Sequence, residues 1–423
     1  MLTRDEEHAL SVLDERELVA DLVELIRIPS VTGTDAESEL QHRQAGQLAE
    51  LGMDVDSWRL DLAALQADPR YPGTEAERLE GYGVVARTEG AGTPAFVLQG
   101  HVDVVPTGDL EHWAGHDPFG GRIDGDVVHG RGACDMKAGV AVNTAVARAL
   151  HRSGLYLERP FAVHSVVSEE DGGLGAFATL VRGHAGEAAV ITEPTAGQVV
   201  TAHAGALTFT VSVPGRAAHG STRAEGVSAF DAYLPIHRAI LELERARNAD
   251  PHPRFGDNRL PYPISIGRIV AGDWSSSVPD LLTAEGRLGV RLGEDPADAR
   301  AALEQALAQV CAGDPWLADH PARLAWTGGQ FASGATPEGD PLIADVAAAA
   351  RDSGGRPPEG QRAVPYGSDL RLYTGIGGIP TLLYGPGDVR NAHAPREQVG
   401  IGETVEVART LLLAAVRRCR AHR

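Results

Sequence analysis

The 423-residue sequence has few cysteines, few aromatic residues and no long apolar run. Its cysteines, Cys134, Cys311 and Cys419, are far apart and form no CxxC pair, which excludes a disulfide framework and favours a reducing compartment. No run of 18 apolar residues is present, so we expect no membrane-spanning helix. The charged segment 1–22 lacks the apolar core of a secretory signal, and we therefore expect a cytoplasmic protein.

Positive charge is also scarce. The chain has 38 lysines and arginines against 58 aspartates and glutamates, which gives a net charge of −20 at pH 7. Such an acidic chain is unsuited to binding nucleic acid or an anionic membrane. Hydrophobic residues make up 43% of the sequence, as in soluble globular proteins, and the length allows two or three domains with a large core.

Hydrophobic periodicity predicts alternating strands and helices. Apolar residues at helical spacing predict a helix over 15–28 that stops before Pro29. Apolar strands are predicted at 83–87, 95–100, 161–167, 188–192 and 380–384, and further helices near 36–51, 136–152, 172–182 and 340–352. This alternation indicates an α/β domain around a mixed, largely parallel sheet.

The pattern changes after about residue 200. Alternating strands are predicted at 207–215, 264–272, 281–292 and 322–328, with helices at 230–248 and 297–312. The resulting order β-α-β-β-α-β is that of the ferredoxin-like α+β unit. We therefore expect a domain formed by residues 1–201 and 327–423, interrupted by an inserted domain at 202–326.

Acidic residues and histidines follow several predicted strands. In LQGHVDVVPTGD, His101 and Asp103 come directly after an apolar strand and point to the same side because they are two residues apart. Similar positions are occupied by Asp135 in GRGACDMKAG, Glu169 and Glu170 in VVSEEDGG, Glu193 in VITEPTAG and His393 in NAHAPRE. Ligand sites in α/β sheets lie at the carboxyl ends of the strands, so these residues are expected to converge.

Each of these stretches has an ordinary interpretation when it is taken alone. An HxD is commonly a hydrogen-bonded surface pair, adjacent glutamates usually lie on a solvated face, and an aspartate after glycine often caps a turn or helix. Taken together, two histidines and several carboxylates suit one or two divalent ions, with zinc the leading candidate.

Five blocks, GHVDVVP, GRGACDMKAG, SEEDGG, TEPT and AHAPRE, resemble in sequence and order the signature blocks of metallopeptidase family 20. This co-catalytic zinc family includes acetylornithine deacetylase, succinyl-diaminopimelate desuccinylase, aminoacylase-1 and glutamate carboxypeptidase. The resemblance covers essentially the whole chain. It implies a zinc-exopeptidase-like catalytic domain with an inserted lid or dimerisation domain, and a homodimer formed through that insert.

The resemblance also implies a ligand for each position of a two-metal centre. His101 and Glu193 would bind one ion, and His393 and Glu170 the other. Asp135 would bridge the two. The ions are expected to be Zn²⁺, with Co²⁺ or Mn²⁺ as alternatives.

Catalytic roles follow from the same resemblance. Glu169 would be the general base, and Asp103 would accept the second ring N–H of His101, which fixes the tautomer of that ligand. The peptide Asp135–Met136 would be cis. His219 in RAAHGST would help to stabilise the oxyanion of the intermediate, although a capping or surface histidine is the alternative.

Substrate contacts are less well defined by the sequence. Ser277 stands where many relatives carry an asparagine, which departs from the pattern. Arg287 and Arg291 could pair with a substrate carboxylate, or could be solvated residues on a strand. Gly367 and Ser368 in YGSDLRLYTG could hydrogen-bond to the polar end of a substrate.

These features support three alternatives for function. The first is a metal-dependent amidohydrolase that removes the acyl group from an N-acyl amino acid or a related small molecule. The second is a dipeptidase or carboxypeptidase with the same chemistry. The third is a non-catalytic binding protein, but its expected sign is the loss of a ligand or of Glu169, and all are present. No GxxxxGK motif supports a nucleotide-binding loop.

Overall fold

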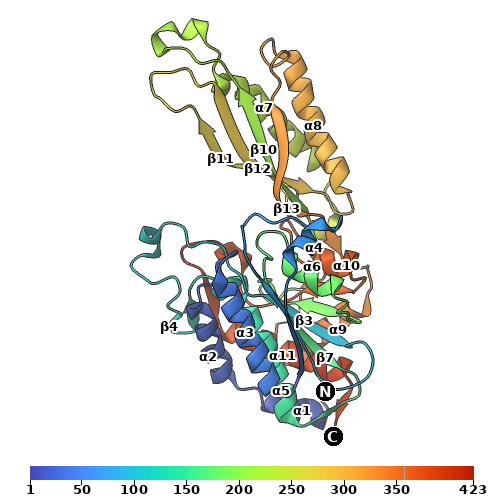
Figure 1. Cartoon of the computed structure of the whole chain (residues 1–423). Coiled ribbons are helices and arrows are strands. Elements are labelled where there is room, and N and C mark those ends of the chain that lie inside the picture. The colour runs from blue at the N-terminus through green and yellow to red at the C-terminus, as the bar shows by residue number, and fades with distance from the viewer. Residues whose placement is uncertain (357) are drawn as a thin grey trace. The chain divides into compact units, whose positions relative to one another are not determined.

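The computed structural model describes residues 1–356 and 358–423 and contains two compact units (Figure 1). The larger unit consists of Met1–Ala202, Ala335–Arg362 and Ser368–Arg423, and the inserted unit of His203–Gly334 and Ala363–Gly367. The insertion therefore ends later than the expected residue 326. The reason is strand β13 (Arg323–Phe331), which stays paired with the sheet of the inserted unit as far as Phe331.

The larger unit is built around a mixed sheet that is largely parallel at its centre, as predicted. In the described chain the strand order is β1 (Asp54–Arg59), β2 (Tyr82–Arg87), β7 (Phe161–Val166), β3 (Phe96–His101), β8 (Ala189–Ile191), β16 (Thr381–Leu383), β9 (Val200–His203) and β14 (Gly334–Ala335), with β15 (Arg362–Val364) also paired to β9. Strands β7, β3, β8 and β16 are parallel, whereas the pairs β1–β2, β2–β7 and β16–β9 are antiparallel.

Helices cover both faces of this sheet, which explains why its central strands are buried throughout. Helices α3 (Asp35–Glu50) and α5 (Ala138–Ser153) lie on one face, where Ser165 of β7 donates a hydrogen bond to Gln41 of α3. Helices α6 (Leu174–Val181) and α10 (Leu370–Gly375) lie on the other, where His164 meets the hydroxyl of Tyr373. Neighbouring strand residues thus point to opposite layers.

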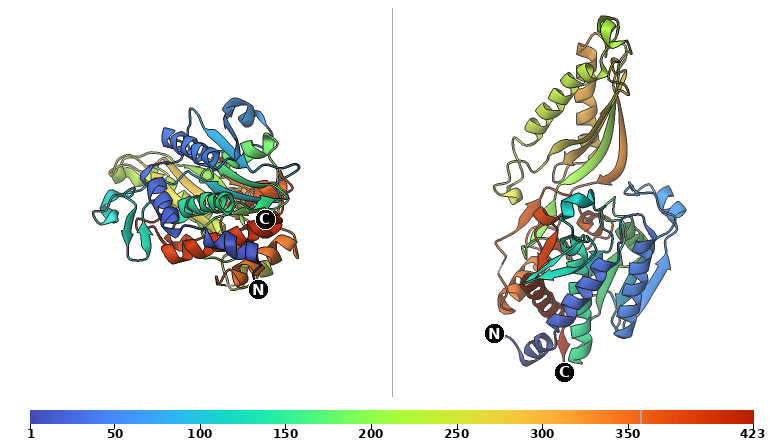
Figure 2. Two further views of the ribbon diagram at one scale, coloured as in Figure 1. Left: turned by 90° about the horizontal axis from the view of Figure 1, so that it is seen from below. Right: turned by 90° about the vertical axis from the view of Figure 1, so that its left-hand side faces the viewer.

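The remaining elements of the larger unit complete its outer layer. They are helices α1 (Arg4–Ser11), α2 (Glu15–Arg27), α4 (Leu62–Ala67), α9 (Pro341–Asp352) and α11 (Ile401–Arg418), the small sheet β17 (Gln398–Gly400), β5 (Val127–His129) and β4 (Arg122–Asp124), and the pair β18 (Ala421–His422) and β6 (Tyr156–Leu157). Both termini lie on the same side of this unit, where Arg423 pairs with Asp5 (Figure 2). None of the described helices is long and apolar enough to cross a membrane.

The inserted unit has the predicted ferredoxin-like fold. Its elements follow the order β10 (Gly205–Pro214), α7 (Ala229–Arg247), β11 (Ile264–Ala271), β12 (Leu281–Val290), α8 (Pro296–Gly313) and β13. The antiparallel sheet has the spatial order β11-β12-β10-β13. Alternate residues of β10, such as Phe209 and Val211, are buried in a core shared with Ile236 of α7 and Leu303 of α8.

Candidate metal centre and active site

The predicted ligands all belong to the larger unit and lie at the carboxyl ends of its parallel strands. His101 is the last residue of β3, Glu169 and Glu170 lie in the turn after β7, and Glu193 lies two residues beyond β8. Asp135 reaches the same place from the π-helical turn Ala133–Lys137, which leads into α5. His393 follows the 3-10 turn Val389–Asn391 after β16.

Asp135 lies between the two histidines, one carboxylate oxygen facing each. Its Oδ1 is 3.3 Å from Nε2 of His101, and its Oδ2 is 3.6 Å from Nε2 of His393. Glu170 Oε2 lies 3.0 Å from His393 Nε2, and Glu193 Oε1 lies 3.9 Å from His101 Nε2. The structure therefore brings together the five residues that the sequence nominated as ligands.

Glu169 completes the cluster. One oxygen or nitrogen each of His101, Glu169 and Glu193 lies within 4.8 Å of the others, and the same holds for His101, Asp135 and Glu170. Both groups contain His101, and Glu170 also meets His393 through its Oε2. The two adjacent glutamates lie in a turn that follows β7.

The contacts of His101 show which of its ring nitrogens faces the cluster. The ring is fully buried, and Nδ1 lies 2.9 Å from the main-chain carbonyl of Asp103, so Nδ1–H donates to that carbonyl. Nε2 faces the carboxylates and has no hydrogen-bond partner among the described residues. A buried, unsatisfied ring nitrogen that faces carboxylates fits a metal ligand.

The carboxylate of Asp103 lies beside the ring of His101 and also binds the turn of the two glutamates. Its Oδ1 is 3.5 Å from His101 Nδ1, and the main-chain carbonyl of Asp103 is closer to that nitrogen. The carboxylate also accepts the backbone N–H groups of Glu169 at 3.1 Å and of Glu170 at 3.2 Å. The side chain therefore holds the turn that carries the two glutamates, while the backbone orients the histidine.

The electrostatics of the cluster also favour bound cations. Burial, and then neighbouring carboxylates, raises the pKa of Glu169 well above its ordinary value. Burial likewise raises the pKa of Glu193. The hydrogen bond with Glu170 raises the pKa of His393 to about 9. Carboxylates packed so closely repel one another, and divalent ions would offset that repulsion.

Glu397 binds the backbone of Asp135. Glu397 was not singled out from the sequence, although it lies in the block AHAPRE. Its Oε1 accepts the N–H groups of Cys134 and Asp135, each at 3.0 Å, and its Oε2 pairs with Arg131 at 2.5 Å. Both side chains of this pair are buried. The peptide Asp135–Met136 is cis, as the family resemblance implied.

The other predicted site residues are not part of this cluster. His219 is an exposed residue of the inserted unit that caps a 3-10 turn and bonds to Ser221. Arg287 donates to the carbonyl of Pro365 at 2.9 Å, within the inserted unit. Arg291 donates to the last carbonyls of α7, Ala246 and Arg247, at 3.0 Å, so it stabilises the end of that helix.

Gly367 and Ser368, the remaining predicted contacts, have structural roles. A side chain at Gly367 would collide with Phe331, because a Cβ atom there would lie 2.7 Å from the ring. Ser368 is buried, and its hydroxyl oxygen accepts the N–H of Leu370 at 3.3 Å, within a turn that leads into α10. Whether either residue also meets a substrate remains a prediction.

Comparison with known sequences identifies the family. Residues 97–417 match peptidase family M20/M25/M40, and the chain belongs to this family. It is 30% identical over 341 residues to N-acetyl-L-citrulline deacetylase of Xanthomonas campestris, with 79% of this chain and 85% of that protein covered. It is 25% identical over 394 residues to the N-formyl-4-amino-5-aminomethyl-2-methylpyrimidine deformylase of Halalkalibacterium halodurans, with 86% and 85% covered.

Solved structures of family members have the same fold. The dipeptidase Dug1p of Saccharomyces cerevisiae superimposes with a TM-score of 0.75 at 15% identity, covering 98% of both chains. A dinuclear metal-binding M20 peptidase of Bacillus subtilis gives a TM-score of 0.61 at 17% identity, covering 95% of this chain and 98% of the other. The resemblance found in the five sequence blocks is thus confirmed, and the protein is a metal-dependent amide hydrolase of the M20 family.

Proposed function

We propose that this protein removes the acyl group from an N-acyl amino acid or a related small N-acyl compound by hydrolysing its amide bond. The observation that carries the proposal is Asp135, which lies between His101 and His393 with Glu169 alongside. Relatives named as deacetylase and deformylase, matched over most of their length, support an acyl substrate.

The second candidate is a dipeptidase or carboxypeptidase. It is supported by a probable carboxypeptidase of Aspergillus niger, which is 26% identical with 97% of this chain and 93% of that protein covered. The described cluster suits both reactions, because an acyl amide and a peptide bond present the same carbonyl and nitrogen to it.

The proposed centre holds two divalent ions, Zn²⁺ first, with Co²⁺ or Mn²⁺ as alternatives. His101 and Glu193 would hold one ion and His393 and Glu170 the other, with Asp135 shared. Nitrogen and oxygen donors of this kind suit zinc. When bound, the two ions would supply Lewis-acid activation of a water molecule and of the amide carbonyl.

The remaining chemistry is assigned to the chain itself. Glu169 would accept the proton of the attacking water and later deliver it to the leaving nitrogen. Its burial and its raised pKa suit a group that must hold a proton between these two events. Asp103 would keep Glu169 in place through the backbone N–H that it accepts. We assign the donor for the oxyanion to His219 of the inserted unit.

The adjacent glutamates provide a matched test. In Glu169→Gln we expect both metal ions to remain bound, as measured by elemental mass spectrometry, while kcat falls by about 10²–10⁴-fold. In Glu170→Gln we expect one ion to be lost. A Glu169→Gln variant with near wild-type kcat would show that this residue is not the general base.

A substrate panel separates the two candidates. N-acetyl, N-formyl and N-succinyl amino acids would be compared with dipeptides, after loading the enzyme with Zn²⁺, Co²⁺ or Mn²⁺. Deacylase function predicts a higher kcat/KM for an N-acyl compound than for any dipeptide tested. The opposite ranking would favour the peptidase.

We also propose a homodimer formed through the inserted unit, and a cytoplasmic location. Strand β11 is an edge strand of its sheet, and Ile269 and Val270 on it are each 49% exposed, which suits pairing with a second copy. Cys134, Cys311 and Cys419 are free and buried, which suits a reducing compartment. Light scattering at micromolar concentration tests the dimer, and a monomeric mass would contradict it.

A further inference from the structure

The turn that carries Glu169 and Glu170 is held through its backbone by buried carboxylates. Ser168 begins the turn with φ of 63°, a left-handed conformation that is uncommon for a residue with a side chain. Its N–H donates to Glu37 Oε1 at 3.2 Å, and the next two N–H groups donate to Asp103. Three successive amides are therefore fixed by two carboxylates.

Asp171 holds the same turn from its other end. The Ser168 hydroxyl donates to Asp171 Oδ1, and Asp171 Oδ2 accepts the N–H groups of Glu75 at 3.2 Å and Ala76 at 2.9 Å. The backbones also approach closely here, since a Cβ atom on Gly172 would lie 2.0 Å from the carbonyl oxygen of Gly73. The turn is thus joined to the segment 71–79.

Arg78 of that segment connects the two carboxylates that bind Ser168. Its side chain is only 4% exposed. Nη1 donates to Glu37 Oε2 at 3.1 Å and to Oε1 at 3.3 Å, and Nη2 lies 3.6 Å from Asp171 Oδ1. Without the guanidinium, Glu37 and Asp171 would lose the buried cation that binds both of them on either side of Ser168.

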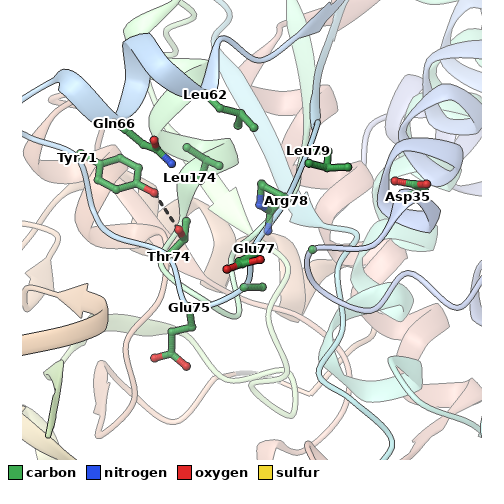
Figure 3. A pocket seen from close by; sticks show the side chains of 12 residues that line it. Asp35, Leu62, Gln66, Tyr71, Thr74, Glu75, Glu77, Arg78, Leu79 and Leu174 are labelled. Atoms are coloured by element: carbon green, nitrogen blue, oxygen red, sulfur yellow. Dashed lines mark hydrogen bonds between the residues drawn. The ribbon is translucent and has the colours of Figure 1, made fainter.

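The outer side of the segment 71–79 borders a cavity of about 640 Å³. Figure 3 shows Tyr71, Thr74, Arg78 and Leu174 around this space, with Tyr71 hydrogen-bonded to Thr74. This side of the segment faces open space, so the contacts of Arg78 and Asp171 help to hold the segment against the turn.

We propose that Arg78 is a positioning residue for catalysis: by binding Glu37 and Asp171 together, it fixes the turn Ser168–Asp171, and so the direction of Glu169 and Glu170. The inference rests on the proposed role of Glu169 as the general base. An arginine is suited to this task because its planar fork meets two carboxylates at once, whereas a lysine presents a single point charge.

The test compares Arg78→Met and Arg78→Lys with a control, Arg148→Met. Arg148 is 11% exposed and joins α5 to α2 through Asp21 and Glu17, away from the turn. The measurements are kcat and KM for the best substrate of the panel, metal content and melting temperature. For Arg78→Met we expect kcat to fall by about 10–100-fold with KM within twofold of wild type, and Arg78→Lys to recover part of the loss. Arg148→Met should lower the melting temperature and leave kcat unchanged.

The outcomes separate this inference from the proposed function. If Glu169→Gln is inactive but folded Arg78→Met keeps the wild-type kcat, the positioning role is wrong and the general base stands. If Glu169→Gln keeps its kcat, the proposed function fails and the inference fails with it. If Arg78→Met does not fold, Arg78→Lys decides: a several-fold loss of kcat in the folded variant supports the role, and an unchanged kcat overturns it.

Discussion

The buried pair Arg131–Glu397 allows a stability prediction whose size can be worked out from the contacts. Glu397→Gln preserves the shape of the side chain but removes its charge. In the wild type, one oxygen of Glu397 accepts two backbone N–H groups and the other pairs with Arg131. Glutamine has a single oxygen, so it can serve either the amides or Arg131, and its NH₂ group must face a donor at the other position.

The expected loss follows from the burial of the pair. The two side chains are 2% and 1% exposed, and breaking such a pair from one side lowers the free energy of unfolding by about 3–5 kcal/mol. Unfolding entropy is about 2.1 cal/mol/K per residue, so a chain of 423 residues loses roughly 1 °C of melting temperature for each kcal/mol, and we expect a decrease of about 3–6 °C. The N–H of Asp135 loses support at the same time, so weaker metal binding should accompany the decrease.

The assay is scanning calorimetry of wild type, Glu397→Gln, Arg131→Met and the double variant, all treated with a chelator so that metal binding does not contribute to stability. The double variant should lose less than the sum of the two single losses, because each single variant leaves an unpaired group that the double variant lacks. A Glu397→Gln protein that melts within 1 °C of wild type, or strictly additive losses, would refute the reasoning.

Two further predictions concern metal removal and pH. Chelation should abolish activity and lower the melting temperature, and added Zn²⁺ should restore both. The reason is that an ion at 1,000 times its Kd stabilises the folded state by about 4 kcal/mol. An unchanged melting temperature would contradict the proposed centre. Burial, followed by the charge of His184, lowers the pKa of His164 to about 3. Below pH 6.5 the unfolded chain therefore takes up a proton that the folded chain refuses, and stability falls towards acid by up to about 1.4 kcal/mol per pH unit. Urea unfolding between pH 7 and pH 4 should show a shallower pH slope for His164→Gln than for wild type, and equal slopes would sink this explanation.

The α/β architecture and the convergence of the ligands could be predicted because both depend on short-range patterns. Each candidate ligand except His393 lies within a few residues of an apolar strand or at the start of a helix, and the carboxyl ends of parallel strands meet at one edge. The ferredoxin-like unit was also predictable, since β10 alternates between buried and half-buried residues from Leu207 to Pro214. Helix α11 was missed, although its apolar stripe between Val405 and Val416 is visible in the sequence.

The residues that support the centre could not be predicted from the sequence, for a different reason. Glu37, Arg78 and Glu397 occur among charged residues that look solvent-exposed in the sequence, and their partners are tens to hundreds of positions away. No periodicity signals such a pairing. Likewise, the spacing of His101 and Asp103 shows that they share a side but not which oxygen of Asp103 meets the ring. Strand β1 was missed because DVDSWR is too polar to be recognised as a strand.

The two histidines of the cluster differ in their freedom to move. His101 is fully buried at the end of a central strand, whereas the side chain of His393 is 54% exposed on a loop. The His393 ring can swing into water by rotating its own side chain, but the His101 ring cannot leave without disturbing the sheet. Metal ions bound by this pair would therefore bind and dissociate one after the other. The ion held by His393 would dissociate first, and the ion held by His101 would stay bound longest.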